Sequence, residues 1–418
     1  MPAEADLIRF IEKFTFEENN VSSPAKRTLI DYLAAGGIKT FRYTNEFWTS
    51  RQRQAASIHE ISYRACFKPQ LPRFFINLLT KPKDTVYDPF AGRGTTTIEA
   101  ALMGRKTIAN DINPLSRIFS EPRLAVPSIE QVSNRLAEIS FQKASINDLD
   151  LSMFYHSQTE SELRSLRGYL TEKQEESLDD NIDRWIRMVA TNRLTGHSKG
   201  FFSVYTMPPN QAVSAARQEI LNLRRGQTPE YRDVKTIILK KSYQLMRNLT
   251  DEQLRNLKIA AKSAVFLQND AAETENIPTA SVNLTVTSPP FLNIVQYSQD
   301  NWLRCWFNNI ALDGLEKQMT MATSLNQWSS AMGSVFNELY RITRPGGWVA
   351  FEVGEVRSGK IRLEEQVIPI GVHSGFKCVG VVVNQQTFTK TSNIWGIKNN
   401  YSGTNSNRIV LFSKNMSG

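Results

Sequence analysis

The chain has 418 residues, enough to bury one or two sizeable hydrophobic cores, and its length suggests roughly two to three domains. Its composition, 41% hydrophobic and 22% charged, is that of an ordinary globular protein, and no apolar run approaches the roughly 20 residues that span a bilayer. A net charge of +9 permits nucleic-acid binding without establishing it.

The cysteines argue against a metal-binding or disulfide-rich protein, and the N-terminal residues argue against a secreted one. Cys66, Cys305 and Cys378 share no close spacing, which rules out a CxxC-type metal site and argues against a disulfide framework. We therefore expect reduced thiols and no metal. The first residues are acidic where a signal peptide is basic and then apolar, so we expect a cytoplasmic protein, in the prokaryotic cytosol or nucleoid.

Residues 1–58 read as an N-terminal arm that is partly helical and partly aromatic and basic. Apolar residues at helical spacing predict helices over 6–11 and 26–35. Residues 41–54 interleave aromatic rings with arginines. Such a segment can stack bases and contact phosphates, or it can pack its rings on the core and leave its arginines in solvent. Both interpretations stay open.

The next segment contains a strand, a glycine-rich turn and a helix. Residues 67–72 (FKPQLP) enter an amphipathic helix, and residues 84–87 predict a short strand. The strand leads into DPFAGRGTT at 88–96, followed by a predicted helix over 97–103. Glycines allow a close backbone approach, and the helix N-terminus favours an anion, so this unit is typical of nucleotide or cofactor binding. Neither the P-loop nor the GxGxxG pattern is met.

A second predicted strand, 105–109, ends at NDINP, residues 110–114. Asp111 follows the glycine turn by about twenty residues, which is where an acidic residue usually holds a ribose diol.

Residues 120–262 are richer in charge and in helical patterns, such as 160–170 and 179–189, and show no strand–helix alternation. We interpret them as an inserted, mainly helical domain. The loop 196–211 within it is polar, basic and aromatic together. We favour a loop that faces nucleic acid; the alternative is a glycine-rich connection whose Phe201 and Phe202 belong to the core.

The alternating pattern resumes after the insertion. The predicted elements are strands at 264–267, 282–286, 348–353, 378–383 and 408–412 and a helix at 328–342, with a tight turn at 345–347 and a polar loop at 388–407. The strand at 282–286 runs into TSPPF, residues 287–291. Proline has no backbone N–H, so this segment cannot extend a sheet ladder. It leaves a rigid turn with a hydroxyl, carbonyls and a flat ring, which suits an amino group on a flat heterocycle.

Four motifs together resemble the amino-group DNA methyltransferases that use S-adenosylmethionine, the cytosine-N4 and adenine-N6 family. They are DPFAGRGTT (88–96), NDIN (110–113), TSPPF (287–291) and RPGGWVAFEV (344–353). Either motif of the DPFxGxGT and SPPF pair is weak evidence for the family when it occurs alone, whereas the occurrence of both in one chain is specific.

The resemblance implies an α/β, Rossmann-like class I methyltransferase fold. Its seven-stranded, mostly parallel sheet would form from residues 59–119 and 263–418. Residues 120–262 would be the inserted helical domain and a candidate for target recognition, with the loop 388–407 as a second candidate.

The resemblance also implies residue roles. The S-adenosylmethionine site would take in the following residues: Lys68, Pro69, Asp88, Pro89, Phe90, Gly92, Gly94, Thr95, Thr96, Asp111, Ile112 and Asp270. Among them Asp111 would hold the ribose hydroxyls, and Asp270 would lie near the adenine amino group, although Asp270 also reads as a turn or helix-cap residue. The catalytic turn would be Ser288, Pro289, Pro290 and Phe291.

In the methyl transfer that the resemblance implies, the Ser288 hydroxyl and the Pro289 carbonyl would accept hydrogen bonds from an exocyclic amine of the target base. Phe291 stacks on a base that has been flipped out of the duplex. Positioning and preorganised electrostatics carry most of the rate effect. The final proton acceptor is not visible in the sequence.

Serine at the first catalytic position resembles the cytosine-N4 group, whereas aspartate or asparagine is commoner in adenine-N6 enzymes. We therefore expect cytosine N4 as the target, and adenine N6 stays as the alternative. Methylation at carbon 5 of cytosine needs a cysteine nucleophile after a proline, and no cysteine of this chain fits. An RNA guanine-N2 methyltransferase and an inactive DNA-binding subunit are further alternatives. The expected partner is double-stranded DNA, and a restriction–modification role would add a cognate endonuclease.

Overall fold

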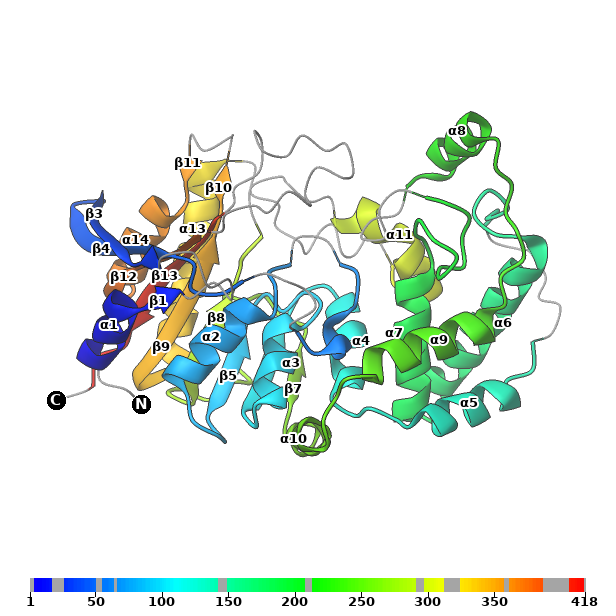
Figure 1. Ribbon diagram of the computed structural model, residues 1–418, viewed down its shortest axis with the longest axis horizontal. Helices are drawn as coiled ribbons and strands as arrows, with labels where there is room; N and C mark the ends of the chain where they lie inside the picture. The colour runs from blue at the N-terminus through cyan, green and yellow to red at the C-terminus, as the bar shows by residue number, and fades with distance from the viewer. Residues whose placement is uncertain are drawn as a thin grey trace.

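A computed structural model describes residues 4–16, 26–49, 55–63, 66–141, 149–206, 213–290, 297–311, 324–356, 361–385 and 406–416. Its centre is a nine-stranded sheet (Figure 1). In spatial order the strands are β3 (Leu29–Ala35), β4 (Ile38–Asn45), β12 (Lys377–Gln385), β13 (Ser406–Ser413), β9 (Thr343–Val353), β8 (Val282–Thr287), β5 (Thr85–Asp88), β6 (Lys106–Asn110) and β7 (Val265–Leu267).

The sheet is mostly parallel. The neighbouring strands from β9 to β7 all run parallel, as do β12 and β4. Strand β13 runs antiparallel to both of its neighbours, and β3 runs antiparallel to β4. The prediction of a Rossmann-like, mostly parallel sheet is confirmed, but the strand count was too low, because β3 and β4 extend seven strands to nine.

The two added strands come from the segment that was predicted as a helix and an arm. The helix predicted over 26–35 is wrong: these residues form a short strand, β2 (Lys26–Arg27), and then β3. Gly36 and Gly37 both have positive φ and close a tight hairpin between β3 and β4. A Gly-Gly pair between two strand-length segments was the signal for a hairpin, and it outweighed the helical spacing of the apolar residues.

The aromatic residues after the hairpin belong to the core. Tyr43, Phe47 and Trp48 are buried in one cluster with α1 and α2. Of the two interpretations of this segment, ring packing holds for these three residues. Residues 50–54, which include Arg51 and Arg53, lie outside the described part of the chain.

The helices are α1 (Glu4–Lys13), α2 (Gln70–Leu79), α3 (Thr95–Leu102), α4 (Leu115–Ser120), α5 (Ile129–Glu138), α6 (Ser157–Glu175), α7 (Asn181–Arg193), α8 (Ala215–Arg225), α9 (Val234–Met246), α10 (Asp251–Ala261), α11 (Tyr297–Phe307), α13 (Leu325–Ile342) and α14 (Glu364–His373). Two short antiparallel pairs complete the described elements: β1 (Thr15–Phe16) with β2, and β10 (Glu355–Val356) with β11 (Ile361–Arg362).

Helices cover both faces of the sheet. Helices α1 and α2 pack on one face, against strand residues such as Val286 and Ala350. Helices α13 and α14 pack on the other, against residues such as Phe351 and Val381. Alternating strand residues therefore point into two separate cores, as a sheet buried on both faces requires.

The segment between β6 and β7 holds helices and no strand among its described residues, and it forms a third core beside the sheet (Figure 1). Trp185 of α7 is fully buried there and donates from Nε1 to Ser242 Oγ of α9 at 2.9 Å. Helix α11, which follows the TSPPF segment, adds Leu303 and Phe307 to this core. The chain that follows the TSPP residues thus returns to the helical part.

Within the described residues, none of the helices is both long and apolar enough to cross a membrane. Cys66, Cys305 and Cys378 form no disulfide. The described part of the chain contains no cluster of histidine, cysteine, aspartate or glutamate with the arrangement of a metal site.

Candidate functional site

The DPF and TSPP motifs, 199 residues apart, meet at the carboxyl ends of β5 and β8. Thr287 Oγ1 donates to Asp88 Oδ1 at 2.6 Å, and the Phe90 amide donates to the same oxygen at 3.1 Å. Thr96 Oγ1 donates to the Val286 carbonyl at 3.0 Å, which adds a second link between the halves. The two motifs are therefore parts of one hydrogen-bonded unit.

Asp88 is the centre of this unit. Its side chain is 1% exposed, and burial raises the pKa of its carboxyl to about 7, against the lowering effect of the hydrogen bonds from Thr287, Phe90 and Thr96. Asp88 was expected to line the methyl-donor pocket. The structure directs its carboxylate to the threonines of the two motifs.

The glycine-rich turn lies against Asp111. The Gly92 amide donates to Asp111 Oδ2 at 2.7 Å, and the Asn113 amide donates to Oδ1 at 2.9 Å. Burial raises the pKa of Asp111 to about 6, while these two amides lower it. Gly92 and Gly94 have φ values of +53° and +75°, in the left-handed region that side chains other than hydrogen disfavour.

Two arginines brace the turn, Arg93 from within it and Arg123 from another segment. Arg93 Nη1 donates to the Ile61 carbonyl at 2.5 Å, and the buried Arg123 donates to the Arg93 carbonyl. A β-carbon on Gly94 would lie 2.8 Å from Ser120 Cβ. The turn therefore has no room for a side chain at Gly94 and is held in one conformation.

The segment before α2 lies beside the turn. A β-carbon on Gly92 would meet Cys66 Sγ at 3.7 Å. Burial lowers the pKa of Lys68, and the nearby Arg93 guanidinium lowers it further. Pro69 is buried and caps the N-terminus of α2. Lys68 is therefore close to Arg93 of the glycine turn.

The sequence reasoning passed over Asn110, which ties three strand ends together. Its Nδ2 donates to the carbonyls of Pro89 (3.3 Å) and Asn269 (3.0 Å), and its Oδ1 accepts from the Asn269 amide at 2.9 Å. Asn110 belongs to the NDIN motif, whose predicted cofactor residues are Asp111 and Ile112. A buried polar residue at the last position of a strand was the available signal.

Asp270 is exposed, and its Oδ1 caps the Ala272 amide at 2.9 Å. This is the kind of contact that a turn residue makes. Thr95 is buried and accepts from Arg93 Nε through its hydroxyl at 3.3 Å, and Ile112 is half-buried after β6.

Trp328 of α13 is hydrogen-bonded to the turn from Ser288 to Pro290, which was predicted to be catalytic. Its indole Nε1 donates to the Pro290 carbonyl at 2.9 Å from the buried face of α13. Ser288 is half-buried and Pro289 is buried. Among the described residues, no group donates a hydrogen bond to the Pro289 carbonyl. Phe291 lies outside the described residues.

Glu352 is the functional candidate that the sequence reasoning missed. The pairing of Thr287 with Phe351 places Ser288 next to Glu352 on β9. The Ser288 hydroxyl donates to the Glu352 carboxylate, and Asn407 Nδ2 donates to its Oε1 at 2.7 Å. Burial raises the pKa of Glu352, and these two hydrogen bonds oppose that rise. The signal was an acidic residue inside the apolar strand of RPGGWVAFEV.

The loop 196–211 has a buried base and an exposed tip. Phe201 and Phe202 are buried, as the core interpretation expected, and the Arg193 guanidinium lies 3.9 Å from the Phe201 ring centroid. Residues 197–200 (HSKG) are exposed. Residues 207–211 of this loop and residues 388–405 of the second candidate loop lie outside the described part.

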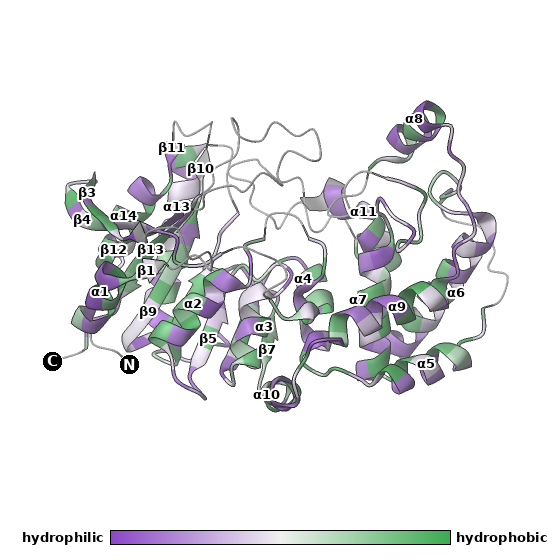
Figure 2. Cartoon of the chain, in the orientation of Figure 1, coloured by the Kyte–Doolittle hydropathy of each residue, from purple (hydrophilic) through white to green (hydrophobic). Residues whose placement is uncertain are grey.

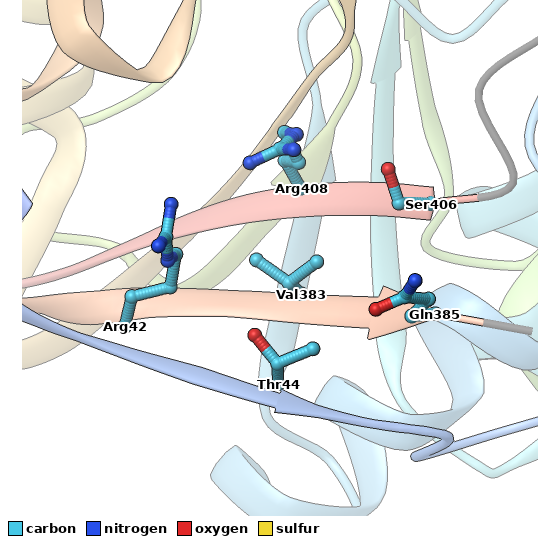
Figure 3. Close-up of a pocket in the computed structure, with 6 residues that line it drawn as sticks. All are labelled: Arg42, Thr44, Val383, Gln385, Ser406 and Arg408. Atoms are coloured by element: carbon cyan, nitrogen blue, oxygen red, sulfur yellow. The ribbon is translucent and has the colours of Figure 1, made fainter. Parts of the chain in front are cut away.

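A cavity of about 260 Å³ opens on the α14 side of the sheet, away from the predicted residues. Figure 3 shows its lining, which consists of Arg42, Thr44, Val383, Gln385, Ser406 and Arg408. Arg42 pairs with Asp31 at 2.6 Å and Arg408 with Glu364 at 2.8 Å. Because its cations already have carboxylate partners, we assign this cavity no role in methyl transfer.

The residues at the ends of β5 and β6 fit a ligand with paired hydroxyl groups. Both oxygens of Asp111 accept one backbone amide each, and a carboxylate oxygen can accept a second hydrogen bond. The braced glycine turn beside it allows a close approach of backbone to ligand. These are the requirements of the ribose and methionine parts of S-adenosylmethionine.

Comparisons with known proteins point to the same family. A family model for N6/N4 methyltransferases, described as DNA methylase, matches residues 12–117. The Type II methyltransferase M.MvaI of Kocuria varians is 24% identical over 295 residues, which are 65% of this chain and 60% of that protein. The Type II methyltransferase M.BsoBI of Geobacillus stearothermophilus is 41% identical over 69 residues, 16% of this chain and 14% of its own.

Among solved structures, the rRNA methyltransferase aviRa of Streptomyces viridochromogenes aligns with a TM-score of 0.34 at 11% identity, over 86% of this chain and 90% of its own. A likeness of this size carries no argument. The evidence for a similarity is instead the motifs, their meeting at the sheet edge and the matching family model. The chain is therefore similar to the amino-group DNA methyltransferases, in its motifs and in the family match over residues 12–117.

Proposed function

We propose that this protein is a site-specific DNA methyltransferase that acts on the N4 amine of a flipped cytosine in duplex DNA. The observation that carries the proposal is the joined pair of contacts Thr287–Asp88 and Ser288–Glu352. The first fastens the catalytic turn to the glycine-rich turn. The second gives the catalytic serine a defined hydrogen-bonding role.

Ser288 supplies the acceptor for the amine. A hydroxyl has one proton and two lone pairs. Because Glu352 takes the proton, the lone pairs of Ser288 are left to accept an N–H of the target base. The Pro289 carbonyl is the second acceptor. Together they favour the pyramidal amine, whose lone pair is no longer delocalised into the ring.

S-adenosylmethionine is the methyl donor of this family and supplies an electrophilic methyl group when bound. Asp111 and the turn from Gly92 to Gly94 would hold it, through hydrogen bonds to its hydroxyls and through close backbone contact. Asp88 acts between the two turns, where it keeps the distance from the donor site to Ser288 constant.

The methylated nitrogen must lose a proton, and Glu352 is its proposed destination. The amine proton passes to Ser288 Oγ as the hydroxyl proton of Ser288 passes to the Glu352 carboxylate. This leaves a neutral methylamine, an intact serine and a protonated glutamate. A carboxylate with a raised pKa is a better base than an ordinary one, which suits the task.

The chain spans 60% of the length of M.MvaI, so the following role is likewise proposed. M.MvaI, M.MjaII of Methanocaldococcus jannaschii and M.BsoBI are all named Type II methyltransferases. We infer that this protein modifies DNA in a restriction–modification system, with a cognate endonuclease as partner.

Nucleoside analysis tests the substrate base. The protein is incubated with duplex DNA and S-adenosylmethionine, the DNA is digested, and the nucleosides are measured by mass spectrometry. We expect N4-methylcytidine, in its deoxy form. Methylation of deoxyadenosine alone would move the assignment to adenine N6. Transfer to tRNA but not to duplex DNA would support an RNA methyltransferase. Absence of S-adenosylmethionine binding in calorimetry would support an inactive subunit.

A further inference from the structure

Helix α8 is attached to the protein by one polar face. Gln218 is its buried residue, and Gln218 Nε2 donates to the Tyr205 carbonyl at 3.0 Å. One turn later, Asn222 Nδ2 donates to the Met153 carbonyl at 2.8 Å. The Arg225 guanidinium lies 3.9 Å from the ring centroid of Tyr205. Ala215 at the start of α8 packs against the helical core, but the other anchoring contacts are polar, whereas a helix usually joins a core by apolar packing.

The opposite face of α8 combines apolar and basic side chains in solvent. With 3.6 residues per turn, Arg217, Ile220, Leu223 and Arg224 fall on one side, away from Gln218 and Asn222. Ile220 is 51% exposed and Leu223 is 83% exposed. Neither Arg217 nor Arg224 forms an ion pair with another described residue. Figure 2 shows this mixture of polar and apolar residues on a helix that stands clear of its neighbours.

The support beneath α8 is rigid. Gly196 and Tyr205 form a β-bridge, and a β-carbon on Gly196 would overlap the ring of Phe201. Arg232 Nη1 donates to the carbonyls of Ser198 and Phe201 at 3.0 and 2.9 Å. The loop that carries the Tyr205 anchor is thus braced by side chains from two directions, which fixes where α8 sits.

The position of α8 relates its open face to the catalytic turn. In Figure 1, α8 stands on the side of the molecule where the parallel strands end, which is also where Ser288 follows β8. Helix α10 lies on the opposite side, where the strands begin. A duplex that presents a base to Ser288 must lie along the first of these sides.

We propose that α8 enters the major groove of the duplex next to the target base and is a principal reading element of this protein. At 11 residues it is roughly 16 Å long, and a helix of ordinary diameter fits the groove. Arg217 and Arg224 match phosphates or guanine edges, and Ile220 and Leu223 match thymine methyl groups. The proposal rests on the proposed DNA substrate and names the element that reads it.

Paired variants test the basic residues. Arg217→Ala with Arg224→Ala is compared with Arg255→Ala plus Lys258→Ala, two exposed cations on α10. Fluorescence anisotropy with a short duplex of mixed sequence measures binding. We expect binding roughly tenfold weaker for each arginine lost from α8. The slope of log affinity against log salt concentration should become shallower by about one for each phosphate contact that is lost. The α10 pair should bind like the parent chain.

A second pair tests the apolar residues. Leu223→Gln is compared with Ile259→Gln, which is 65% exposed on α10. Sequencing that reports modified bases with their contexts should show an altered or relaxed context for Leu223→Gln and an unchanged context for Ile259→Gln. Circular dichroism checks that all variants fold.

The outcomes separate the two proposals. If the parent chain methylates DNA while the α8 variants keep its affinity and context, the reading role of α8 is wrong and the proposed function stands. If binding depends on α8 but no base is methylated, the proposed function fails and the DNA-binding role of α8 stands. Self-association that Leu223→Gln abolishes, with DNA binding unchanged, would identify a second copy of the chain as the occupant and overturn the inference.

Discussion

Asp88 illustrates how a single residue can couple two distant motifs. A buried carboxylate is costly unless hydrogen bonds satisfy it, and two donors to Asp88, the Thr287 hydroxyl and the Phe90 amide, come from the motifs themselves. The folded pKa of about 7 lies above the ordinary aspartate value of 3.8. The folded chain therefore holds a proton that the unfolded chain has released, so this group's contribution to stability falls as pH rises between about 4 and 7.

Thr287→Val removes the hydroxyl that Asp88 accepts. We expect a loss of about 1–3 kcal/mol in the free energy of unfolding. The loss should be larger at pH 8 than at pH 5, because the hydrogen bond stabilises the ionised carboxylate and its removal raises the pKa further. Chemical denaturation at both pH values measures it. Thr285→Val is the matched control, since Thr285 Oγ1 is buried without a partner among the described residues. Equal losses for the two variants would contradict this role.

The proposed role of Glu352 as proton acceptor can be tested separately from its role in the fold. Because Glu352→Gln cannot take up the amine proton, we expect kcat to fall roughly a hundredfold, with KM for DNA little changed. In the parent enzyme, activity should rise with pH as Glu352 ionises, around a midpoint above the ordinary glutamate value. Single-turnover methylation across pH measures both effects. Glu352→Asp should restore part of the rate, and a Glu352→Gln enzyme that keeps the full rising limb would argue against proton transfer to this group.

At the scale of elements, the glycine-rich turn is held by contacts from outside itself. Gly92, Gly94 and the Arg93 carbonyl are each fixed by a partner from another segment. The motif predicts the glycines, and the partners explain why the turn has one conformation. A rigid turn of this kind preorganises a site for its ligand.

Gly94→Ala tests that rigidity. We expect a cost of about 1–2 kcal/mol for the left-handed backbone, and about 1–3 kcal/mol more for the overlap with Ser120. Gly37→Ala carries the first cost alone, because its φ is +80° and nothing lies within 4 Å of the added carbon. Thermal unfolding of both variants separates the two terms. Similar melting temperatures would show that the Ser120 contact relaxes without cost.

At the scale of the molecule, α11 connects the chain that follows TSPP to the helical part. Trp302 Nε1 donates to the Val213 carbonyl at 3.1 Å, close to the start of α8. Arg304 Nη2 reaches the Ser62 carbonyl at 3.1 Å. Helix α11 is therefore fixed between the residues that precede α8 and the loop around Ser62.

Leu303→Ala tests this coupling. Leu303 is 1% exposed in the helical core, so we expect a loss of about 2–5 kcal/mol in the free energy of unfolding. Because α11 directs the chain that leaves the catalytic turn, kcat should fall as well. Denaturation and single-turnover kinetics measure the two effects. Leu254→Ala on the surface of α10 should change neither. An unstable Leu303→Ala protein with full activity would show that α11 does not set the turn.

The sequence alone determined the local units. A strand ending in DPFAGRGTT and a strand ending in TSPPF were predicted correctly, because proline and glycine restrict the backbone wherever they occur. The fold class followed from the pairing of these motifs. The hairpin of β3 and β4 was missed because short apolar segments fit helix and strand alike, and only the Gly-Gly turn distinguishes them.

Only the tertiary structure decided which side chains meet. Asp88 with Thr287, and Ser288 with Glu352, are joined by strand order and register, which no local pattern encodes. The same holds for Gln218 and Asn222, whose long-range contacts determine which face of α8 is left open. Each local segment of the sequence determines its own turn, strand end or helix start. Hydrogen bonds between segments far apart in sequence exist only after the sheet has assembled, and they turn two motifs into one site.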